Sequence, residues 1–489
     1  MSTDLLSAGR ATYNEELDSW ISKKKAAVKL INAVGNLLYD NSVELVLFRN
    51  HLVDTSVSEV LLLHKYAADV VGKPISVHET TAVAQALVKM DLAPSKIDVG
   101  LLTAEWMEVK NDYESIESFL GTKLAGFTSF DDIGQGPRDV VLYGFGRIGR
   151  LAARELIQQF GKGQQLRLKA IVTRKVTDEE IIKRADLLRL DSVHGPFPGT
   201  VVPDLERKAI IINGQIVKMI QAPGPDQVNY EDHGISDAIV LDNTGAFRDR
   251  EALSLHLKSQ GISKVILTAP GKGVPNIVYG INHESLDLEN ENVYSAASCT
   301  TNAISTVLSV IQNKYGIEKG HIETVHAYTN DQNLLDNFHK KERRGRSAAL
   351  NMVITETGAG AAVTKVIPEL KDKLTANAVR VPVPNGSLAI MNLTLDKETS
   401  VEEVNAAVKE AALKGNLVNQ IHYSIEPELV SSDIVGDTCC SVYDSKATLV
   451  HPDKKSVVLY VGYDNEYGYT KQVIRLAKYV AKVRRKHYY

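Results

Sequence analysis

The sequence predicts an α/β protein of three parts: an α-helical N-terminal region, a doubly wound domain with a parallel sheet, and an α+β domain with a mixed sheet. Three observations predict it. Before residue 134, apolar residues recur at helical spacing. From Arg138, short apolar runs alternate with turns and helical stretches, as a parallel sheet with crossover helices requires. After Ser298 a helix follows at once, and the later apolar runs favour a mixed sheet with helices on one side.

Turn-forming residues gather at Gly134-Gln135-Gly136-Pro137 and mark the first boundary. We therefore expect a helical N-terminal extension over residues 1–134 and the doubly wound domain over residues 138–298. The mixed-sheet domain is expected over residues 299–464. Residues 465–489 are expected to supply a C-terminal helix that completes the doubly wound domain.

Each predicted element has its own local pattern. In the N-terminal region, apolar residues recur every three or four positions over residues 15–38, 56–71, 80–90 and 113–124, which predicts helices. Short apolar runs predict strands at residues 140–143, 168–172, 210–212, 238–241 and 265–267, and later at 322–327, 377–382, 388–395 and 456–463. The chain closes with a predicted amphipathic helix over residues 472–486, whose basic end suits a helix C-terminus.

Composition excludes several classes of protein. The chain has 56 basic and 60 acidic residues, so its net charge of −4 gives no reason to expect binding to nucleic acid or to an anionic membrane. No apolar run reaches the roughly 18 residues of a membrane span, and no secretory leader is recognisable, so we expect a cytoplasmic protein. Cys299, Cys439 and Cys440 are too few and too badly spaced for a disulfide framework or a zinc site.

A glycine-rich turn lies between the first predicted strand and a predicted helix at residues 150–160. It reads Gly144-Phe145-Gly146-Arg147-Ile148-Gly149. Glycines at these spacings permit a tight turn and let the backbone approach a pyrophosphate, whose charge then lies at the positive end of the helix. The motif predicts a Rossmann-type dinucleotide-binding domain, although a glycine-rich turn without a ligand has the same pattern.

The acidic residue that would normally bind the adenine ribose about 20 residues after these glycines is absent. The second predicted strand ends instead in Thr173-Arg174. A hydroxyl and a guanidinium could receive a 2′-phosphate, so we expect NAD or NADP as cofactor, with NADP or dual use as the hypothesis to test.

The sequence Ser298-Cys299-Thr300-Thr301-Asn302 lies where a strand region gives way to a predicted helix. The helix dipole stabilises a thiolate at that position, and a nearby imidazole lowers the thiol pKa further. His326, on a later predicted strand, is the natural partner. A single cysteine is more often a small buried apolar residue, so the surrounding sequence decides its role.

That surrounding sequence closely resembles the phosphorylating glyceraldehyde-3-phosphate dehydrogenase family. Besides Ala297-Ser298-Cys299-Thr300-Thr301-Asn302, the matching segments occur in the family's order at residues 143–150, 191–195, 244–245, 268–270, 281–284, 344–346, 357–359, 365–370, 380–382 and 463–466. The resemblance implies that Cys299 attacks an aldehyde, that His326 acts as acid and base, and that phosphate attacks the resulting thioester. No metal is implied.

The resemblance also implies a role for each matching position. Thr329 and Arg380 would hold the phosphate of the sugar substrate, with Arg344 close to both anions. Ser298, Thr300, Thr357 and Gly358 would hold the attacking inorganic phosphate. The cofactor would be bound by Gly144, Gly146, Arg147, Ile148, Gly149, Thr173, Arg174, Thr244, Gly245, Phe247, Thr268 and Asn465.

The sequence departs from the family's usual pattern at several places. Asp331 stands where many members have a hydroxyl residue, which leaves the sugar phosphate open between glyceraldehyde 3-phosphate and erythrose 4-phosphate. Asn337-Phe338 replaces a Leu-Pro pair near the adenine ribose and again suggests NADP use. Adenine contacts cannot be carried over to residues 222–232. The extension before residue 134 is either a packed structural cap or a docking module.

Three functions therefore remain open at this point. The first is reversible, phosphate-dependent oxidation of glyceraldehyde 3-phosphate in glycolysis or gluconeogenesis. The second is oxidation of erythrose 4-phosphate, in which water releases the acyl group. The third is a redox-sensing or binding protein built on an inactive enzyme, with Cys299 merely oxidisable. The resemblance implies a homo-oligomer, usually a tetramer, formed through the arginine-rich loop at residues 333–348.

Overall fold

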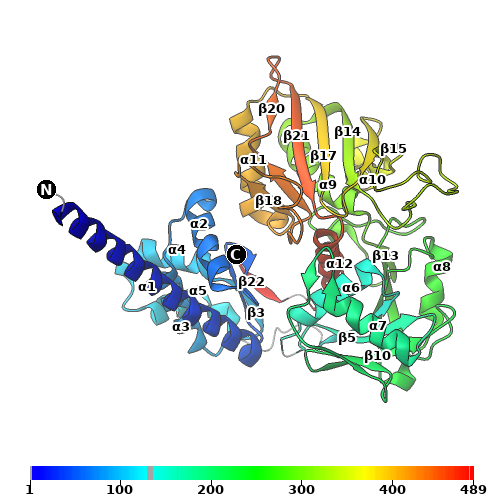
Figure 1. Cartoon of the computed structure of the whole chain (residues 1–489), viewed down its shortest axis with the longest axis horizontal. Helices are drawn as coiled ribbons and strands as arrows, with labels where there is room; N and C mark the ends of the chain where they lie inside the picture. The colour runs from blue at the N-terminus through cyan, green and yellow to red at the C-terminus, as the bar shows by residue number, and fades with distance from the viewer. Residues whose placement is uncertain (1–2, 129–135, 162, 484) are drawn as a thin grey trace. The chain divides into compact units, whose positions relative to one another are not determined.

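The computed structural model describes residues 3–128, 136–161, 163–483 and 485–489, with side chains from Thr12 onward. The chain forms two compact units (Figure 1). The N-terminal unit comprises Met1–Gly136, Gly161–Gln164 and Arg484–Tyr489, and the main unit comprises Pro137–Phe160 and Gln165–Val483. Residues 134 and 135 of the predicted boundary lie outside the described residues. Within the described ranges, no helix is long and apolar enough to cross a membrane.

Helices dominate the N-terminal unit, as the sequence predicted. They are α1 (Thr3–Asn41), α2 (Val57–Tyr66), α3 (Val77–Val88), α4 (Val99–Val109) and α5 (Ile116–Lys123). Capping boxes begin two of them, with Ser56 and Glu59 at α2 and Ser76 and Glu79 at α3. The unit has an apolar core of its own, in which Leu30, Val83 and Phe119 are fully buried.

The all-helical prediction for this unit was incomplete, because it also contains a four-stranded sheet in the order β2-β1-β3-β22. The strands are β1 (Glu44–Leu47), β2 (Asn50–His51), β3 (Ser95–Asp98) and β22 (Lys486–Tyr488). None exceeds four residues, too short for strand periodicity to be recognised. The predicted helix over residues 472–486 was also wrong in extent, since α12 spans Tyr467–Val480 and the following tail pairs in parallel with β3.

A buried carboxylate organises this small sheet. Phe48 and Arg49 both have positive φ, 43° and 71°, in the two-residue turn between β1 and β2, although neither residue favours that conformation. Asp98, at the end of β3, accepts hydrogen bonds from the backbone N–H groups of Phe48 (2.8 Å), Arg49 (3.0 Å) and Leu101 (3.0 Å). Burial raises the pKa of Asp98 to about 6, against the effect of these bonds.

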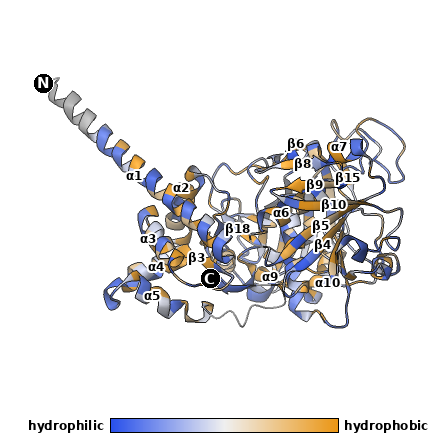
Figure 2. Cartoon of the chain, turned by 90° about the horizontal axis from the view of Figure 1, so that it is seen from below, coloured by the Kyte–Doolittle hydropathy of each residue, from blue (hydrophilic) through white to orange (hydrophobic). Residues whose placement is uncertain are grey.

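The first sheet of the main unit has the order β13-β12-β11-β4-β5-β10-β9-β8. Its strands are β4 (Arg138–Tyr143), β5 (Leu166–Thr173), β8 (Val201–Asp204), β9 (Ala209–Ile212), β10 (Gln215–Gln221), β11 (Ala238–Asp242), β12 (Ile262–Leu267) and β13 (Val293–Ser295). The six strands from β13 to β10 run parallel, as predicted, and β9 and β8 add an antiparallel edge. Figure 2 shows apolar residues along strands such as β10. From β4 the chain first adds β5 on one side and later adds β11 on the other side. Doubly wound folds bind ligands at such a reversal of strand order.

Helices α6 (Arg147–Gln158), α7 (Asp178–Arg189) and α8 (Arg250–Ser254) accompany this sheet. Helix α12 packs against α6, and its buried residues Val473 and Leu476 share a core with Leu142 and Ile171. The C-terminal helix therefore contributes to the core of the doubly wound sheet.

The second sheet of the main unit is mixed, in the order β15-β16-β14-β17-β21-β19-β18, with β20 paired to β21. Its strands are β14 (Ile317–Ala327), β15 (Val353–Thr355), β16 (Leu374–Val381), β17 (Ser387–Leu395), β18 (Ile421–Ser424), β19 (Ser441–Asp444), β20 (Leu449–Val450) and β21 (Ser456–Tyr463). Helices α9 (Cys299–Tyr315), α10 (Ala359–Val366) and α11 (Val401–Leu413) pack on it, with α9 in contact with both of the others. The predicted mixed sheet is confirmed.

Asp98→Ala should loosen the N-terminal unit, because three backbone N–H groups lose their buried acceptor. We expect a local loss of about 3 kcal/mol, which corresponds to about a hundredfold faster amide hydrogen exchange in β1 and α4. Hydrogen exchange of the whole chain, followed by mass spectrometry of peptides, measures this. The control is Asp112→Ala, at an exposed carboxylate beyond the end of α4. Equal exchange in the two variants would contradict the role given to Asp98.

Candidate functional site

Cys299 is the first residue of α9 and is held there by a strained turn. Ala297 has a positive φ of 55°, and its carbonyl accepts a hydrogen bond from the Tyr469 hydroxyl at 3.0 Å. Ser298 caps the helix by accepting from the Thr301 N–H, and the Asn302 amide donates to the carbonyls of residues 296 and 298. Strained backbone kept in place by several hydrogen bonds is common at functional sites.

The structure brings Cys299 and His326 together. The Cys299 Sγ lies 3.6 Å from His326 Nε2. On its other side, His326 Nδ1 lies 2.7 Å from the Ala327 carbonyl oxygen, which also accepts from Arg380 Nη1 at 2.8 Å. When Nδ1–H donates to this carbonyl, the lone pair of Nε2 faces the thiol. The imidazole is then oriented to accept the thiol proton.

Burial keeps this pair neutral at rest. Burial and, after it, the positive charge of Arg380 together lower the pKa of His326 to about 4. Burial also raises the pKa of the Cys299 thiol, while the Thr300 hydrogen bond and the charge of Arg380 lower it. The sequence-based expectation of a lowered thiol pKa was therefore wrong in sign, because burial outweighs the neighbouring dipoles and charge.

Arg380 and Arg344 belong to two separate groups of polar contacts. The Arg380 Nη1 lies 2.8 Å from His326 Nδ1. Farther along, Thr329 donates to Asp331, and Arg344 Nη1 donates to the same carboxylate at 2.6 Å. Burial raises the pKa of Asp331, but the Thr329 bond and the Arg344 charge lower it overall. The extra carboxylate is thus compensated by a guanidinium and a hydroxyl.

The remaining residues expected around phosphate lie at two helix N-termini. Ser298 and Thr300 belong to the start of α9, where the Thr300 hydroxyl lies 3.0 Å from the Tyr463 hydroxyl. Thr357 and Gly358 precede α10, where the Thr357 hydroxyl accepts from the Ala359 N–H. Helix N-termini with hydroxyl groups suit anions.

The three glycines of the nucleotide turn meet three different steric demands. Gly144 has φ 91°, and a Cβ there would lie 2.9 Å from a Thr244 methyl group. A Cβ at Gly149 would lie 2.5 Å from the Gly144 carbonyl oxygen, so this glycine lets α6 pack closely. Gly146 is exposed, with open space where its Cβ would be. Gly144 thus permits the turn, Gly149 permits the packing contact, and Gly146 leaves room for a ligand to approach.

Beside this turn, the end of β11 is fixed by a fully buried hydrogen bond between Asp242 and His256, whose Oδ2 and Nε2 atoms are 3.0 Å apart. The Thr244 hydroxyl and N–H both donate to Asp242 Oδ1. Thr268 donates to the Asp242 carbonyl at 3.0 Å. The predicted cofactor residues Thr244 and Thr268 are thus brought together by a carboxylate that the sequence reasoning missed.

Four other predicted cofactor residues lie at the same edge of the sheet. Gly245 has φ 65° and directly follows Thr244. Phe247 packs edge-on to Tyr143, with ring centroids 6.2 Å apart. At the end of β5, the Thr173 hydroxyl donates to the Lys175 carbonyl and Arg174 is exposed. The carboxyl ends of β4, β5 and β11 therefore carry these residues together.

Asn465 is buried and anchored from the catalytic sheet. Ser387 donates its hydroxyl to Asn465 Oδ1 at 2.9 Å and accepts from the Ala327 N–H at 3.1 Å. One hydroxyl therefore connects Asn465 to the strand that carries His326. The sequence reasoning missed Ser387, and also Tyr463, whose ring packs edge-on to His326 with centroids 5.9 Å apart.

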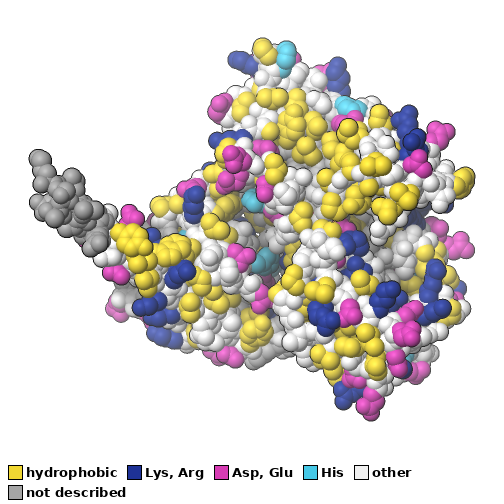
Figure 3. Space-filling view, in the orientation of Figure 1, with side chains coloured by type: hydrophobic (Ala, Val, Ile, Leu, Met, Phe, Trp, Pro, Cys, Tyr) yellow, Lys and Arg dark blue, Asp and Glu magenta, His cyan; other side chains and the backbone are white. Residues whose placement is uncertain are grey.

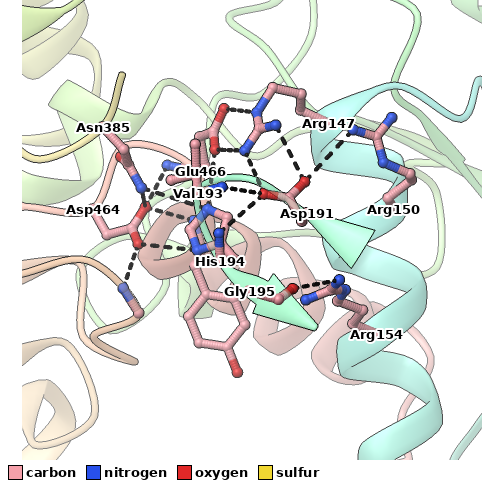
Figure 4. Close-up of polar contacts among 12 residues, drawn as sticks. Arg147, Arg150, Arg154, Asp191, Val193, His194, Gly195, Asn385, Asp464 and Glu466 are labelled. Carbon is pink, nitrogen blue, oxygen red and sulfur yellow. Dashed lines mark hydrogen bonds and ion pairs between the residues drawn. The ribbon is translucent and has the colours of Figure 1, made fainter. Parts of the chain in front are cut away.

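Arg147 is engaged in a cluster of charges (Figure 4). Its guanidinium pairs with both oxygens of Asp191 and of Glu466, and the Glu466 carboxylate also lies 3.0 Å from His194 Nε2. Burial lowers the pKa of Arg147, but the two carboxylates raise it above its ordinary value. Asp464 accepts from the amide of Asn385 at 2.9 Å. Residues 191, 194 and 466 lie in segments matched by the sequence, and that match could have indicated their importance.

The chain is similar to known proteins over both sheets of the main unit. Residues 138–250 match the family model "Glyceraldehyde 3-phosphate dehydrogenase, NAD binding domain", and residues 298–465 match the corresponding C-terminal domain. A glyceraldehyde-3-phosphate dehydrogenase-like protein of Pseudomonas aeruginosa is 46% identical over 459 residues, which cover 93% of this chain and 98% of that protein. The glyceraldehyde-3-phosphate dehydrogenase of Clostridium pasteurianum is 41% identical over 349 residues, 70% of this chain and 98% of that protein.

His326→Asn should slow alkylation of Cys299 by iodoacetamide at pH 7.5, because the thiol loses the base that accepts its proton. We expect a decrease of about tenfold or more, measured by mass spectrometry of the Cys299 peptide. His321→Asn is the control, since His321 lies on the same strand and is partly exposed. Equal alkylation rates in wild type and His326→Asn would show that the contact does not activate the thiol.

Proposed function

Because the chain belongs to the glyceraldehyde-3-phosphate dehydrogenase family, we propose that it catalyses phosphorylating oxidation of glyceraldehyde 3-phosphate to 1,3-bisphosphoglycerate with a nicotinamide dinucleotide. The observation that carries the proposal is the contact of Cys299 with a neutral His326 at the start of α9, next to Arg380. The reaction is reversible, so the same site serves glycolysis or gluconeogenesis.

In the proposed mechanism, His326 Nε2 takes the proton of the Cys299 thiol as the sulfur attacks the aldehyde carbon. The imidazolium formed then faces the new hemithioacetal oxygen. Arg380 and the helix start stabilise negative charge there. After oxidation, the carbonyl carbon is held as a thioester on Cys299. Phosphate oxygen then displaces the sulfur, and the acyl phosphate leaves with the thiolate restored.

The residues of the nucleotide turn fit a dinucleotide, since Gly146 leaves room for close approach of a pyrophosphate and α6 begins at the next residue. The cofactor, when bound, supplies a hydride acceptor. Because the Arg147 side chain is paired with two carboxylates, we assign its proposed pyrophosphate contact, and that of Ile148, to the backbone amides. Asn465 would hold the carboxamide through Nδ2, since its Oδ1 accepts from Ser387.

Two anions must be held near Cys299. We propose that Thr329, Arg344 and Arg380 bind the phosphate of the sugar, and that Ser298, Thr300, Thr357 and Gly358 bind inorganic phosphate. The support is their hydroxyl groups, guanidinium groups and helix N-termini. The pairing of Asp331 with Arg344 supports phosphate binding here, because the guanidinium neutralises the carboxylate. Both sugars carry this phosphate, so a requirement for added inorganic phosphate separates the two reactions.

We further propose a homo-oligomer of the tetrameric kind and a cytoplasmic location. The loop expected to form the contact, at residues 333–348, and the segment after it carry exposed apolar side chains, namely Leu334, Leu335, Phe338, Leu350, Met352 and Ile354. Such a patch on one segment is typical of a protein interface. We also propose that the chain divides into functional parts at residues 1–134, 138–298 and 299–464.

Steady-state kinetics should show oxidation of glyceraldehyde 3-phosphate that depends on added phosphate. Cys299→Ser should lower kcat by about a thousandfold or more, because the thioester cannot form. The control is Cys439→Ser, since Cys439 is a thiol outside the proposed site. A preference for erythrose 4-phosphate without a need for phosphate would instead support the alternative dehydrogenase. Inactivity with both sugars and both cofactors would revive the redox-sensing alternative.

The proposed use of NADP predicts a specific effect at Arg174. Arg174→Leu should lower kcat/KM for NADP by about tenfold or more and leave kcat/KM for NAD unchanged, because only the 2′-phosphate loses a charged hydrogen bond. Arg207→Leu, at an exposed arginine of the same sheet region, is the control. A strong preference of the wild type for NAD would exclude the idea.

A further inference from the structure

Helix α1 consists of two halves with different surroundings. Its C-terminal half packs on α2 and α3, and Ala27, Leu30, Val34 and Leu37 are buried there. From Thr12 to Lys25, every residue is exposed. A segment of about four turns is marginally stable in water unless it packs on something. The exposed half is therefore expected to have a partner.

An apolar stripe formed by Tyr13, Leu17, Trp20, Ile21 and Val28 runs along the exposed half and ends just beyond it. These residues are 66%, 40%, 45%, 39% and 56% exposed, and Figure 3 shows apolar side chains on this part of the helix. Spacings of four, three, one and seven residues place all five on one face, within about 100° of helix rotation. The buried positions of the C-terminal half lie about 120° away from this face. The stripe is thus a second apolar surface of α1.

Charges flank the stripe in a fixed order. On one side of the stripe, Glu16 is followed one heptad later by Lys23. On the other side, Asp18 is followed one heptad later by Lys25. Each flank is therefore acidic toward the N-terminus of the helix and basic toward the residues that pack on the unit. Lys24 lies within the face of the stripe, one heptad after Leu17, and its ammonium group lies over the Trp20 ring, 5.9 Å from its centroid.

The charge order selects one occupant for this surface. In an antiparallel pair of helices, each flank faces the same flank of the other helix in reverse order. The Glu16 of one helix then faces the Lys23 of a copy, and Asp18 faces Lys25, each contact occurring twice by symmetry. A parallel pair would stack acid on acid and base on base. The midpoints of these charge pairs lie at residues 19–22, in the middle of the apolar stripe.

We propose that α1 pairs antiparallel with α1 of a second copy of this chain, around a two-fold axis near Trp20 and Ile21. Leu17 of each helix packs against the aromatic and aliphatic side chains at the centre of the stripe. The segment lies outside both regions matched to the family models, so this contact is additional to an assembly formed by the main unit. A helix pair of this length is a small interface, so its affinity alone is expected to be on the order of micromolar.

Sedimentation velocity of the full chain, across a concentration series, tests the pairing. Leu17→Asp/Trp20→Asp should halve the mass of the assembly, or shift its concentration midpoint at least tenfold. Ser19→Asp/Ser22→Asp adds the same charge on the opposite side of the exposed segment and should leave the mass unchanged. Both variants should keep wild-type dehydrogenase kinetics, which shows that the chain is folded. An unchanged mass in the stripe variant overturns the proposal.

Charge reversal tests the orientation. Glu16→Lys and Lys23→Glu should each weaken self-association by about threefold or more, since each places like charges together twice. The combined Glu16→Lys/Lys23→Glu variant should restore wild-type association. If the double variant instead associates more weakly than wild type by the sum of the two single effects, the antiparallel pair is overturned. A second outcome would also overturn the proposal and would assign the surface to lipid. In that outcome the wild type floats with phosphatidylcholine and phosphatidylglycerol vesicles, and the stripe variant has the same mass as the wild type.

Discussion

The pairing of Arg147 with Asp191 and Glu466 is the constraint on which the site geometry depends. Arg147 is the first residue of α6. Asp191 lies 44 positions after it in the sequence and Glu466 lies 319 positions after it. Both carboxylate side chains are largely buried, at 5% and 12% exposed. Removing one partner would leave a charge without compensation in a poorly solvated place, which is far more costly than a surface pair. Because Asn465 directly precedes Glu466, the same pair fixes the distance between the nucleotide turn and that amide.

The neutral state of the thiol and imidazole follows from the same balance of burial and charge. Arg380 lies close enough to disfavour the imidazolium of His326, yet its charge also favours a thiolate on Cys299. Arg380 therefore opposes the positive charge on His326 and favours the negative charge on Cys299 that a resting thiolate–imidazolium pair would need. Negative charge that develops on a bound substrate meets Arg380 without any rearrangement. The arrangement favours charge during the reaction rather than before it.

Much of the fold could be predicted because its long elements have strong periodicity and its turns have specific chemistry. The parallel strands, the glycine turn and the helix after Cys299 were all predicted from local patterns. The contacts of Ser387 and Glu466 could not be predicted, since each joins residues far apart in the sequence. The contact of Asp242 with His256 could not be predicted either, because it depends on how the packed helix and strand bring the two side chains together. The direction of the thiol pKa shift was also beyond local reasoning, because burial is a property of the packed core.

The C-terminal tail shows why the N-terminal unit could not be assigned from its own segment. Its sheet is completed by Lys486–Tyr488, and the Tyr488 hydroxyl donates to Glu105 at 2.5 Å. Arg49 also stacks on the Tyr489 ring, 4.2 Å from its centroid. A truncation of residues 1–134 alone would leave this tail without its sheet, exposing apolar side chains and an unpaired strand that can pair with other chains. A deletion that asks what the N-terminal unit does must therefore also remove residues 484–489, since otherwise the effect of an orphaned tail would be mistaken for a function of the unit.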